Sequence, residues 1–345
     1  MAEPSLATIV VAYGSERELP QTLAALRAQL EPGDDLVVVD NASADASAEI
    51  ARAAGARVIE LERNVGFAGG CRAGAEATTA PLLFFCNPDC EVAPGTLSAL
   101  RAAATLKPRW GAWQALVTLP GGREVNTSGG ITHWLGMGWA GAYGASVDAV
   151  EPELHEVSFA SGAALMVRRE AWEEVDGFDA AYFMYCEDLD LSLRLRLAGW
   201  GVGIAPQARV EHAYDFDKGS YKWFLLERNR WWTVIGAYPG PLLLALLPAL
   251  LGAELALLAV AARGGWLPEK LRAQAAVLRS LPWALRRRRR VQRTRRAGGE
   301  QALVGALSPA LDSPFLGPVA ELGPVRALQA GYWAFARRVV GGAHG

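Results

Sequence analysis

The stretch Leu82-Leu83-Phe84-Phe85-Cys86-Asn87-Pro88-Asp89 decides the fold, because a run of apolar residues ends abruptly in a carboxylate. The run lies between Pro81 and Pro88 and predicts a strand buried on both faces, as found inside a parallel sheet that helices cover. Ligands of open α/β sheets bind just beyond the strand ends, so we expect Asn87 and Asp89 to face a ligand. Hard oxygen ligands suit Mg²⁺ or Mn²⁺ carrying phosphates. Taken alone, Asn-Pro-Asp is also ordinary turn chemistry.

Strands and helices alternate in the residues that precede this stretch. We expect strands at residues 8–12, 36–39 and 57–61, a helix that Pro20 opens, a helix that residues 41–45 cap, and an Ala-rich helix entered through the glycine-rich turn at residues 64–70. This order predicts right-handed crossovers and an α/β fold with a mostly parallel, doubly wound sheet. The usual Gly-x-Gly-x-x-Gly is missing after the first strand, which argues against a dinucleotide-binding dehydrogenase.

A second acidic segment follows the expected strand at residues 159–167. Glu187 and Asp188 begin a segment rich in Leu and Arg that Gly199 ends, and we interpret this segment as a helix. A helix N-terminus can hold a carboxylate while one oxygen stays free to act as a base, but such a pair can also merely cap the helix. His212 ends the last strand, where a lone histidine is either structural or a ligand.

The region from residue 128 to residue 146 is glycine-rich and aromatic, and it includes Trp139. We interpret it as a mobile loop over the site, with an inert surface loop as the alternative.

Composition indicates a globular protein of enzyme size, because half of the 345 residues are apolar. The net charge of -2 hides an asymmetry: from Arg263 onward fifteen Lys and Arg face four Asp and Glu, a net +11, which leaves -13 for residues 1–262. The four cysteines show no paired spacing and no secretory apolar segment precedes Leu6, so we expect a reducing cytosol. We expect these cysteines to be packing residues.

Residues 241–262 carry Glu254 as their one charge and approach the roughly 20 residues that span a bilayer core. Leu267, Leu271, Leu278 and Leu285 then lie at helical spacing, and five arginines follow at residues 286–290, which indicates an interfacial helix with a basic anchor. A soluble helical cap that uses the same leucines is the alternative. Binding of nucleic acid by the arginines is disfavoured, because no aromatic stacking platform accompanies them.

Several motifs occur together and in order along the first two thirds of the chain, and the set resembles family 2 glycosyltransferases of the GT-A (Rossmann-like) fold. The nearest resemblance is to bacterial rhamnosyltransferase-like members, over roughly residues 6 to 235. The motifs are Asp40-Asn41-Ala42-Ser43-Ala44-Asp45, Asn64-Val65-Gly66-Phe67, Asn87-Pro88-Asp89, Glu187-Asp188-Leu189-Asp190 and Arg228-Asn229.

The resemblance implies roles in binding a nucleotide-sugar. Asp40 would contact the base or ribose, and Asn64, Gly66 and Phe67 would line the same pocket. Asn87 would lie beside the donor, and Arg228 would touch its diphosphate.

The resemblance also implies the chemistry. Asp89 would bind the Mg²⁺ or Mn²⁺ that bridges the diphosphate, with His212 as a second metal ligand. Asp188 would be the general base that accepts the proton of an acceptor hydroxyl during one inverting displacement. We expect Glu187 and Trp139 on the acceptor side.

The sequence departs from the family pattern at three positions. Family members usually carry Asn near Gly14, Cys71 and Arg72, so contacts to base and sugar are not carried over there. Arg72 could instead add a contact to phosphate.

These observations predict a transferase that moves a deoxyhexose such as rhamnose from a dTDP-sugar to a lipid-linked saccharide or polysaccharide. A nucleotidyltransferase that makes nucleotide-sugars and a catalytically silent membrane adaptor are the alternatives. Because nucleotide-sugars are cytosolic and arginines prefer the cytosolic side, we expect a re-entrant or membrane-lying hairpin on an anionic cytoplasmic surface rather than one span. Trp231, Trp232, Trp266 and Trp283 would lie at headgroup level. The expected domains are residues 1–235 (catalytic), 236–297 (helical and membrane-associating) and 298–345 (role unknown).

Overall fold

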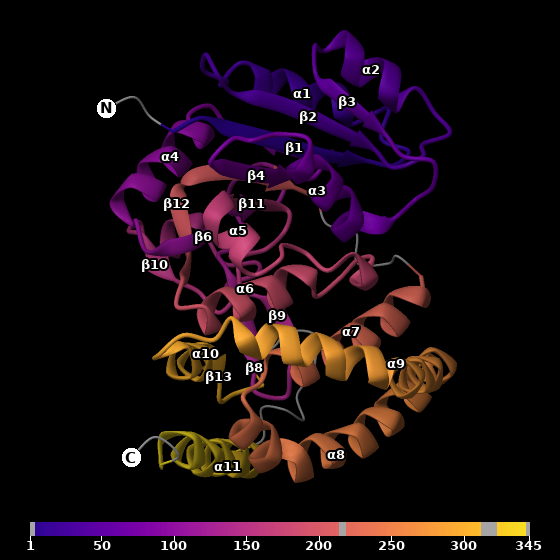
Figure 1. Ribbon diagram of the computed structural model, residues 1–345, viewed down its shortest axis with the longest axis vertical. Coiled ribbons are helices and arrows are strands. Elements are labelled where there is room, and N and C mark those ends of the chain that lie inside the picture. Colours follow the sequence, from indigo (N-terminus) through magenta and orange to yellow (C-terminus); the bar gives the residue numbers. More distant parts are fainter. Residues whose placement is uncertain (1–3, 214–218, 312–322, 343–345) are drawn as a thin grey trace. The chain divides into compact units, whose positions relative to one another are not determined.

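The computed structural model describes residues 4–213, 219–311 and 323–342 (Figure 1). Its contacts divide the chain into two compact units. Helix α7 (Tyr221–Ala237) groups with the C-terminal helices, although we expected residues up to 235 in the catalytic domain. The functional boundaries at residues 235 and 297 stay predictions. The first unit consists of Met1–Gly130, Ala140–Leu195 and Trp200–Asp215, and the second of Ile131–Trp139, Arg196–Gly199 and Phe216–Gly345.

A ten-stranded sheet forms the centre of the first unit, and its main path runs β10-β12-β6-β11-β4-β1-β2-β3. The pairs β1–β2, β1–β4, β2–β3 and β12–β6 are parallel, and β11 runs antiparallel between β4 and β6. The expected mostly parallel sheet is therefore confirmed, with β11 as an antiparallel insertion on the main path. Antiparallel pairs also join β10 and β5 to β12 and β7 to β6. The strands are β1 (Leu6–Ala12), β2 (Asp35–Asp40), β3 (Arg57–Glu60), β4 (Leu82–Cys86), β5 (Cys90–Val92), β6 (Trp110–Thr118), β7 (Val125–Thr127), β10 (His155–Glu156), β11 (Ala164–Arg168) and β12 (Gly201–His212).

Helices connect these strands as the sequence pattern predicts. Helix α3 packs closely on β1, because a Cβ at Gly74 would lie 2.3 Å from Cγ2 of Ile9 and only glycine fits there. The helices of this unit are α1 (Leu19–Arg27), α2 (Ser47–Ala53), α3 (Gly66–Glu76), α4 (Thr96–Leu106), α5 (Arg169–Glu174) and α6 (Glu187–Leu197), with 3-10 turns η1 (Val147–Ala149) and η2 (Ala180–Tyr182).

Helix α6 confirms the helical interpretation of the second acidic segment. Its leucines alternate in sequence like a strand because the helix is buried on all sides, and Leu191, Leu193 and Leu195 have no exposed surface. Arg194 also lies inside, where its Nε donates to the Asp190 carboxylate at 2.6 Å. A buried polar side chain is tolerated when it is paired in this way.

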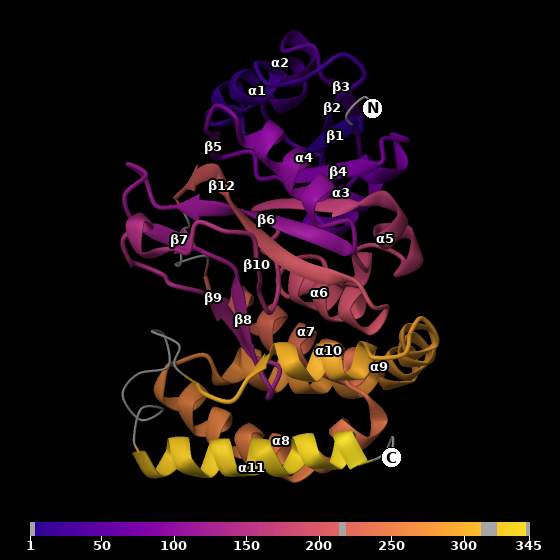
Figure 2. The ribbon, with the colours of Figure 1, turned by 90° about the vertical axis from the view of Figure 1, so that its left-hand side faces the viewer.

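The second unit consists mainly of helices (Figure 2). Helix α11 runs alongside α8, and the Tyr332 hydroxyl donates to the carbonyl of Ala245 at 2.7 Å. Its elements are α7, α8 (Gly240–Arg263), α9 (Leu267–Arg293), α10 (Gly299–Ala306), α11 (Gly323–Gly342) and a small sheet in the order β13 (Leu307–Ser308), β8 (Gly130–His133) and β9 (Gly138–Ala140).

The glycine-rich region at residues 128–146 is not the loop that we expected, because it forms β8 and β9. Gly136, with a φ of +80°, supplies the left-handed turn between them. The aromatic rings pack inward: Trp134 is 3% exposed and Trp139 is 8% exposed. Burial of these large rings explains why a stretch with loop composition has regular structure.

Four charged side chains lie buried between α7, α8 and α9. Arg230 pairs with Glu227 at 3.0 Å and also with Glu254, and Lys270 pairs with Glu254 at 2.7 Å and also with Glu227. Each acid thus faces two bases, so the cluster has no net charge. Glu254, the one charge in the apolar segment 241–262, therefore belongs to the interior of the helical unit.

Candidate active site

The sequence-predicted residues of the first unit gather at the carboxyl edge of its sheet. β1 pairs with β2 on one side and with β4 on the other, so the strand order reverses between β1 and β4. Ligands of doubly wound sheets bind at such a reversal. β11 runs the opposite way, and its first residue, Ala164, pairs with Cys86 at the end of β4. The start of β11 therefore lies at this same edge.

The turn that carries Asp89 is held from two directions. The amide of Cys90 donates to the carbonyl of Asn87 at 3.3 Å, which closes the turn. From α1, the Thr22 hydroxyl lies 2.7 Å from the carbonyl of Pro88 and 2.8 Å from that of Cys90. Thr22 was not singled out in the sequence, because only the crossing of α1 over this turn gives its hydroxyl a role.

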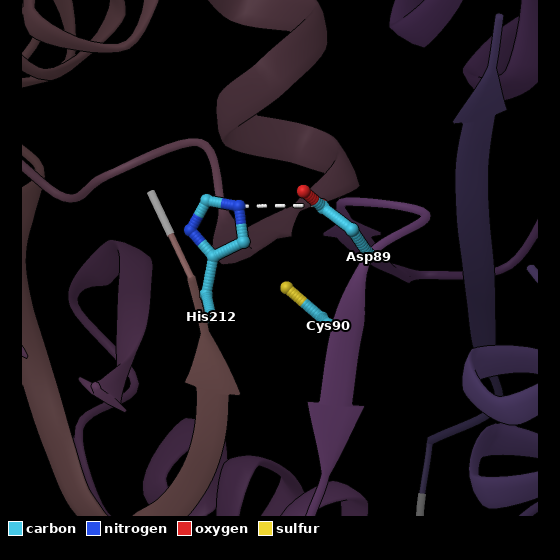
Figure 3. A group of neighbouring side chains, drawn as sticks. All are labelled: Asp89, Cys90 and His212. Carbon is cyan, nitrogen blue, oxygen red and sulfur yellow. Dashed lines mark ion pairs between the residues drawn. The ribbon is translucent and has the colours of Figure 1, made fainter. Parts of the chain in front are cut away.

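His212 lies beside Asp89, as the metal-site prediction requires (Figure 3). Nε2 of His212 is 3.2 Å from Oδ1 of Asp89 and 3.4 Å from Nδ2, the side-chain amide nitrogen, of Asn87. The backbone explains the meeting, since β12 pairs antiparallel with β5 and His212 stands opposite Cys90 in the register. Residues separated by more than a hundred positions thus share one corner of the sheet.

Asp188 reaches the same edge through the segment before β11. Its Oδ2 accepts from the amide of Gly162 at 2.9 Å, and the carbonyl of the next residue, Ala163, accepts from the amide of Asn87 at 3.0 Å. The dipeptide Gly162-Ala163 therefore connects Asp188, the expected base, to the turn that carries Asp89, the expected metal ligand. The other oxygen of Asp188 accepts from the amide of Leu189 at 2.7 Å. An ionised carboxylate has further lone pairs, so Asp188 can still accept a proton.

Both acids at the start of α6 have raised pKa values. Burial raises the pKa of Asp188, although the amides of Gly162 and Leu189 oppose this shift by favouring the ionised form. Burial and the charge of Asp188 raise the pKa of Glu187 well above its ordinary value. Oε2 of Glu187 is buried without a hydrogen-bond partner among the described residues. A carboxylate whose pKa is raised toward neutrality is a better general base than an ordinary aspartate.

Backbone strain lies directly before these acids. Phe183, Tyr185 and Cys186 have φ values of +64°, +70° and +63°, and residues other than glycine rarely adopt such positive φ values. Such strain clusters at functional sites, where the surrounding structure holds it. Here the carbonyl of Phe183 accepts from the amide of Ala68, and a Cβ at Gly66 would lie 2.2 Å from that oxygen. Gly66 therefore lets the expected nucleotide loop approach the acidic segment.

The expected nucleotide residues lie together at the end of β2 and the start of α3. Asp40 ends β2 and accepts from the amide of Ser43 at 3.3 Å. Asn64 accepts from the amide of Gly66 at 2.8 Å and from the side chain of Asn41 at 3.0 Å. Asn41 belongs to the motif of residues 40–45, but the sequence did not indicate a role for it. It is 2% exposed and fixes this loop, because its own oxygen accepts from the amide of Val65 at 2.9 Å.

Other sequence-predicted residues have partners within their own unit. The Phe67 ring packs against Phe178, with centroids 5.9 Å apart. Arg72 donates to the carbonyl and the carboxylate of Asp176. Its guanidinium therefore has a structural role, whereas the sequence analysis considered only a contact to phosphate. Arg228 and Trp139 belong to the second unit, where the Arg228 guanidinium lies over the Trp232 ring at 4.2 Å.

The donor set around Asp89 fits a divalent cation. One oxygen of Asp89, a ring nitrogen of His212 and the sulfur of Cys90 all lie within 4.8 Å of one another, and Asp89 is exposed whereas the other two are buried. Carboxylate and imidazole are ligands that Mg²⁺, Mn²⁺ and Zn²⁺ accept. The sequence missed Cys90, although it directly follows Asp89, because the buried thiol was expected only to pack.

Comparison with known proteins gives the class. The model of the Glycosyl transferase family 2 matches residues 8–175. The chain is 32% identical over 233 residues to an N-acetylglucosaminyl-diphospho-decaprenol L-rhamnosyltransferase of Mycobacterium tuberculosis, covering 60% of this chain and 75% of the relative. It is 42% identical over 65 residues to rhamnosyltransferase WbbL of Escherichia coli K12, covering 19% of this chain and 25% of that protein.

Among solved structures, GalNAc-T7 with UDP, GalNAc and Mn²⁺ matches with a TM-score of 0.54 at 16% identity. The match covers 67% of this chain and 47% of that chain, so this chain spans about half the length of GalNAc-T7, and the likeness concerns the fold. The sheet and the site at its carboxyl edge define the class as a glycosyltransferase of the GT-A fold. The chain belongs to the family 2 glycosyltransferases.

Proposed function

We propose that this glycosyltransferase moves rhamnose from dTDP-rhamnose to a lipid-linked or polysaccharide acceptor during synthesis of cell-envelope glycans. The names of the mycobacterial and enterobacterial relatives support rhamnose as the sugar, and the mycobacterial name supports a polyprenyl-diphosphate acceptor. The observation that carries the proposal is the convergence of Asp188 and the Asp89–His212 pair on one sheet edge through Gly162 and Ala163.

The proposed reaction is a single inverting displacement. The acceptor oxygen forms a bond to the anomeric carbon, the bond from that carbon to the diphosphate oxygen breaks, and Asp188 takes the hydroxyl proton. Asp89 and His212 would hold a divalent cation, which when bound neutralises the charge that develops on the leaving diphosphate. Asp40, Asn64, Gly66, Phe67, Asn87 and Arg228 stay proposed contacts of the donor, and Glu187 and Trp139 stay proposed contacts of the acceptor.

Substitution of Asp188 tests the assignment of the base. We expect Asp188→Asn to lower the transfer rate by about 10²- to 10⁴-fold, the usual contribution of general base catalysis, with donor affinity near normal. Single-turnover assays and calorimetric titration with the donor measure the two quantities. Asp148→Asn, which changes an exposed aspartate, is the matched control. Loss of folding in Asp188→Asn, or full activity, would contradict the assignment.

A panel of nucleotide-sugars with and without Mg²⁺ or Mn²⁺ tests the donor and the cation. We expect transfer or slow hydrolysis from dTDP-rhamnose, and weaker activity after chelation. Turnover of a different donor alone would correct the sugar, and no turnover of any donor would count against the proposal. A nucleotidyltransferase would release pyrophosphate from a nucleoside triphosphate, and a silent adaptor would bind donor without turnover.

We also propose that the second unit lies on an anionic membrane at the cytoplasmic face. Helix α8 is long and apolar enough to cross a bilayer, and among the described residues it is the single helix that is so. However, Glu254 on its inner face is 8% exposed and paired with Arg230 and Lys270, whereas Leu244 and Leu255 are 73% and 71% exposed. One face of α8 is therefore buried against the protein through leucines such as Leu246 and Leu250 and the paired Glu254, while the other face is apolar and exposed. A helix with one covered face and one exposed apolar face favours lying in the interface over crossing it.

Helix α9 supports the same orientation. Of its leucine stripe, Leu271, Leu278 and Leu285 are 50%, 72% and 45% exposed, while Lys270 and Ala273 are buried. The soluble-cap alternative requires these leucines to be covered, and within residues 4–213, 219–311 and 323–342 they are not.

Two details of the expected membrane anchor are wrong. Arg287 is buried and Arg288 donates to the carbonyls of Ile235 and Tyr238, so Arg286, Arg289 and Arg290 remain as exposed bases of the run. Trp232 and Trp266 are 6% and 8% exposed, because Trp232 packs against the tilted ring of Trp283 and Trp266 stacks on Trp223, so neither has the exposed ring that a position among lipid headgroups requires.

Vesicle flotation tests the membrane proposal. We expect the protein to float with phosphatidylcholine vesicles that contain phosphatidylglycerol, and Leu278→Glu to weaken this binding. Leu106→Glu, at a leucine of the first unit that is 69% exposed, is the control. Replacing Arg286, Arg289 and Arg290 by Gln should remove about 1 kcal/mol for each charge. A protein that stays with the soluble fraction at every lipid composition would overturn the proposal.

A further inference from the structure

Cys90 gives the metal site a feature that neither Asp89 nor His212 supplies. It stands opposite His212 in the antiparallel register of β5 and β12, so both side chains leave the sheet on one face. Figure 3 shows the sulfur on one side of the line that joins the imidazole to the carboxylate, facing both groups. The thiol makes a weak hydrogen bond to the carbonyl of Ala163 at 3.6 Å, and the Cys86 thiol is its other hydrogen-bond neighbour.

The separations suit a small tetrahedral ion. Bond lengths of about 2.0 to 2.3 Å to Zn²⁺ place neighbouring ligand atoms about 3.3 to 3.7 Å apart. Nε2 of His212 and Oδ1 of Asp89 are already 3.2 Å apart, and the sulfur lies within 4.8 Å of one ring nitrogen of His212 and one carboxylate oxygen of Asp89. A shift of about 1 Å in one side chain completes a three-ligand shell.

We propose that Asp89, Cys90 and His212 together bind a thiophilic divalent cation, Zn²⁺, with the Cys90 sulfur as third ligand, in competition with the Mg²⁺ or Mn²⁺ that supports transfer. Sulfur, nitrogen and oxygen together form a zinc-type donor set, whereas Mg²⁺ and Mn²⁺ prefer oxygen and gain little from a thiolate. The inference rests on the proposed function in one respect, because both cations would share Asp89 and His212.

Coordination number predicts the consequence. An octahedral cation held by two protein ligands keeps four positions, enough for two diphosphate oxygens, whereas tetrahedral Zn²⁺ with three protein ligands keeps one. Zn²⁺ therefore inhibits transfer, and the inhibition is relieved by excess Mn²⁺. A nucleotide-sugar cannot bridge the zinc ion through both of its phosphates.

Spectroscopy of the full chain after chelation tests the ligand set without any turnover. With Co²⁺ we expect a thiolate-to-cobalt charge-transfer band that Zn²⁺ removes, and X-ray absorption at the zinc edge should show one sulfur at about 2.3 Å. Cys90→Ser should lose the band and weaken zinc affinity by about 100-fold or more, since even outer-sphere losses cost 10- to 100-fold. Cys86→Ser is the matched control, because both thiols are 1% exposed, and it should keep both signals.

The outcomes separate the two proposals. A band that persists in Cys90→Ser, or a zinc shell of nitrogen and oxygen alone, overturns the third ligand. If Cys90→Ser does not fold, X-ray absorption of the wild type and of Cys86→Ser decides: sulfur in both supports Cys90, and its loss in either contradicts it. Transfer with Mn²⁺ is measured on the same preparations. Sulfur-free zinc with normal transfer refutes this inference alone, and sulfur ligation without transfer from any donor counts against the function alone.

Discussion

Two groups of buried carboxylates in this protein respond to burial in opposite ways. At the start of α6, burial raises the pKa values of Glu187 and Asp188. Between α7, α8 and α9, burial would do the same to Glu227 and Glu254, but Arg230 and Lys270 reverse it and lower both values, to about 2 for Glu254. The difference is the presence of a buried cation. Paired acids stabilise a fold, whereas an acid kept without a cation retains basicity that a reaction can use.

Removal of a cation from the helical cluster should have the largest effect on stability. Lys270→Met leaves two buried acids facing Arg230 alone, which should cost about 3 to 5 kcal/mol of unfolding free energy. Urea denaturation of the wild type and the variant measures it. Arg279→Met, at an exposed base of the same helix, is the control, and Lys270→Met combined with Glu254→Gln should recover part of the loss. A cost below about 1 kcal/mol would refute the pairing argument.

The turn that carries Asp89 should depend on the hydroxyl of Thr22, although the turn itself lies partly at the surface. Thr22→Val removes the donor shared by the carbonyls of Pro88 and Cys90, and we expect a loss of about 1 to 3 kcal/mol. Because the turn also positions Asp89, the Mn²⁺ concentration for half-maximal transfer should rise, and Thr22→Ser should restore it. Thermal unfolding and metal titration distinguish positioning from packing, since unchanged metal dependence would leave Thr22 a structural role only.

Glu187→Gln should act with the opposite sign and stabilise the protein. Burial raises the pKa of Glu187 in the folded protein above its value in the unfolded chain. The contribution of Glu187 to the stability of the wild type is therefore complete below the ordinary glutamate pKa and is lost as pH rises toward the raised value. Glutamine has no such loss, so its advantage should appear with rising pH and reach roughly 0.5 to 1 kcal/mol. Melting temperatures across pH measure it. An advantage at acid pH that vanishes at neutral pH would reverse the assignment.

The pH dependence of transfer should show the smallest of these effects. A base works when deprotonated, so kcat/KM should fall on acidification through the raised pKa of Asp188, at a pH above the ordinary range of an aspartate. An initial-rate profile at low donor concentration reports this value. If kcat/KM instead falls only at or below the ordinary aspartate pKa, the ionised form of Asp188 is stabilised by a partner, as Glu227 and Glu254 are by Arg230 and Lys270.

Local patterns predicted much of the first unit correctly. Short apolar runs located β1, β2 and β4, and an acidic start with a glycine stop identified α6 as a helix against the strand-like spacing of its leucines. Motif order identified the family. Strands, helices and short motifs depend on residues that are close in sequence, so they can be predicted from the sequence alone.

Other features were not predictable from local patterns. The hairpin of β8 and β9 has the composition of a loop and is regular because its tryptophans are buried. Cys90 was expected only to pack, and Thr22 was not considered, because their neighbours His212 and Pro88 are distant in sequence. The leucine stripe of α9 predicted an amphipathic helix but not which face the bundle would cover.

The sequence by itself determined β1, β2, β4 and α6 and which acids stand at the ends of such elements, because propensity and periodicity act over short distances. Only the tertiary structure decided that Asp188 joins the Asp89 turn through Gly162 and Ala163, and that Glu254 finds two bases. These results depend on strand register and helix packing. Both are set by the free energy of burying the whole core rather than by any one segment.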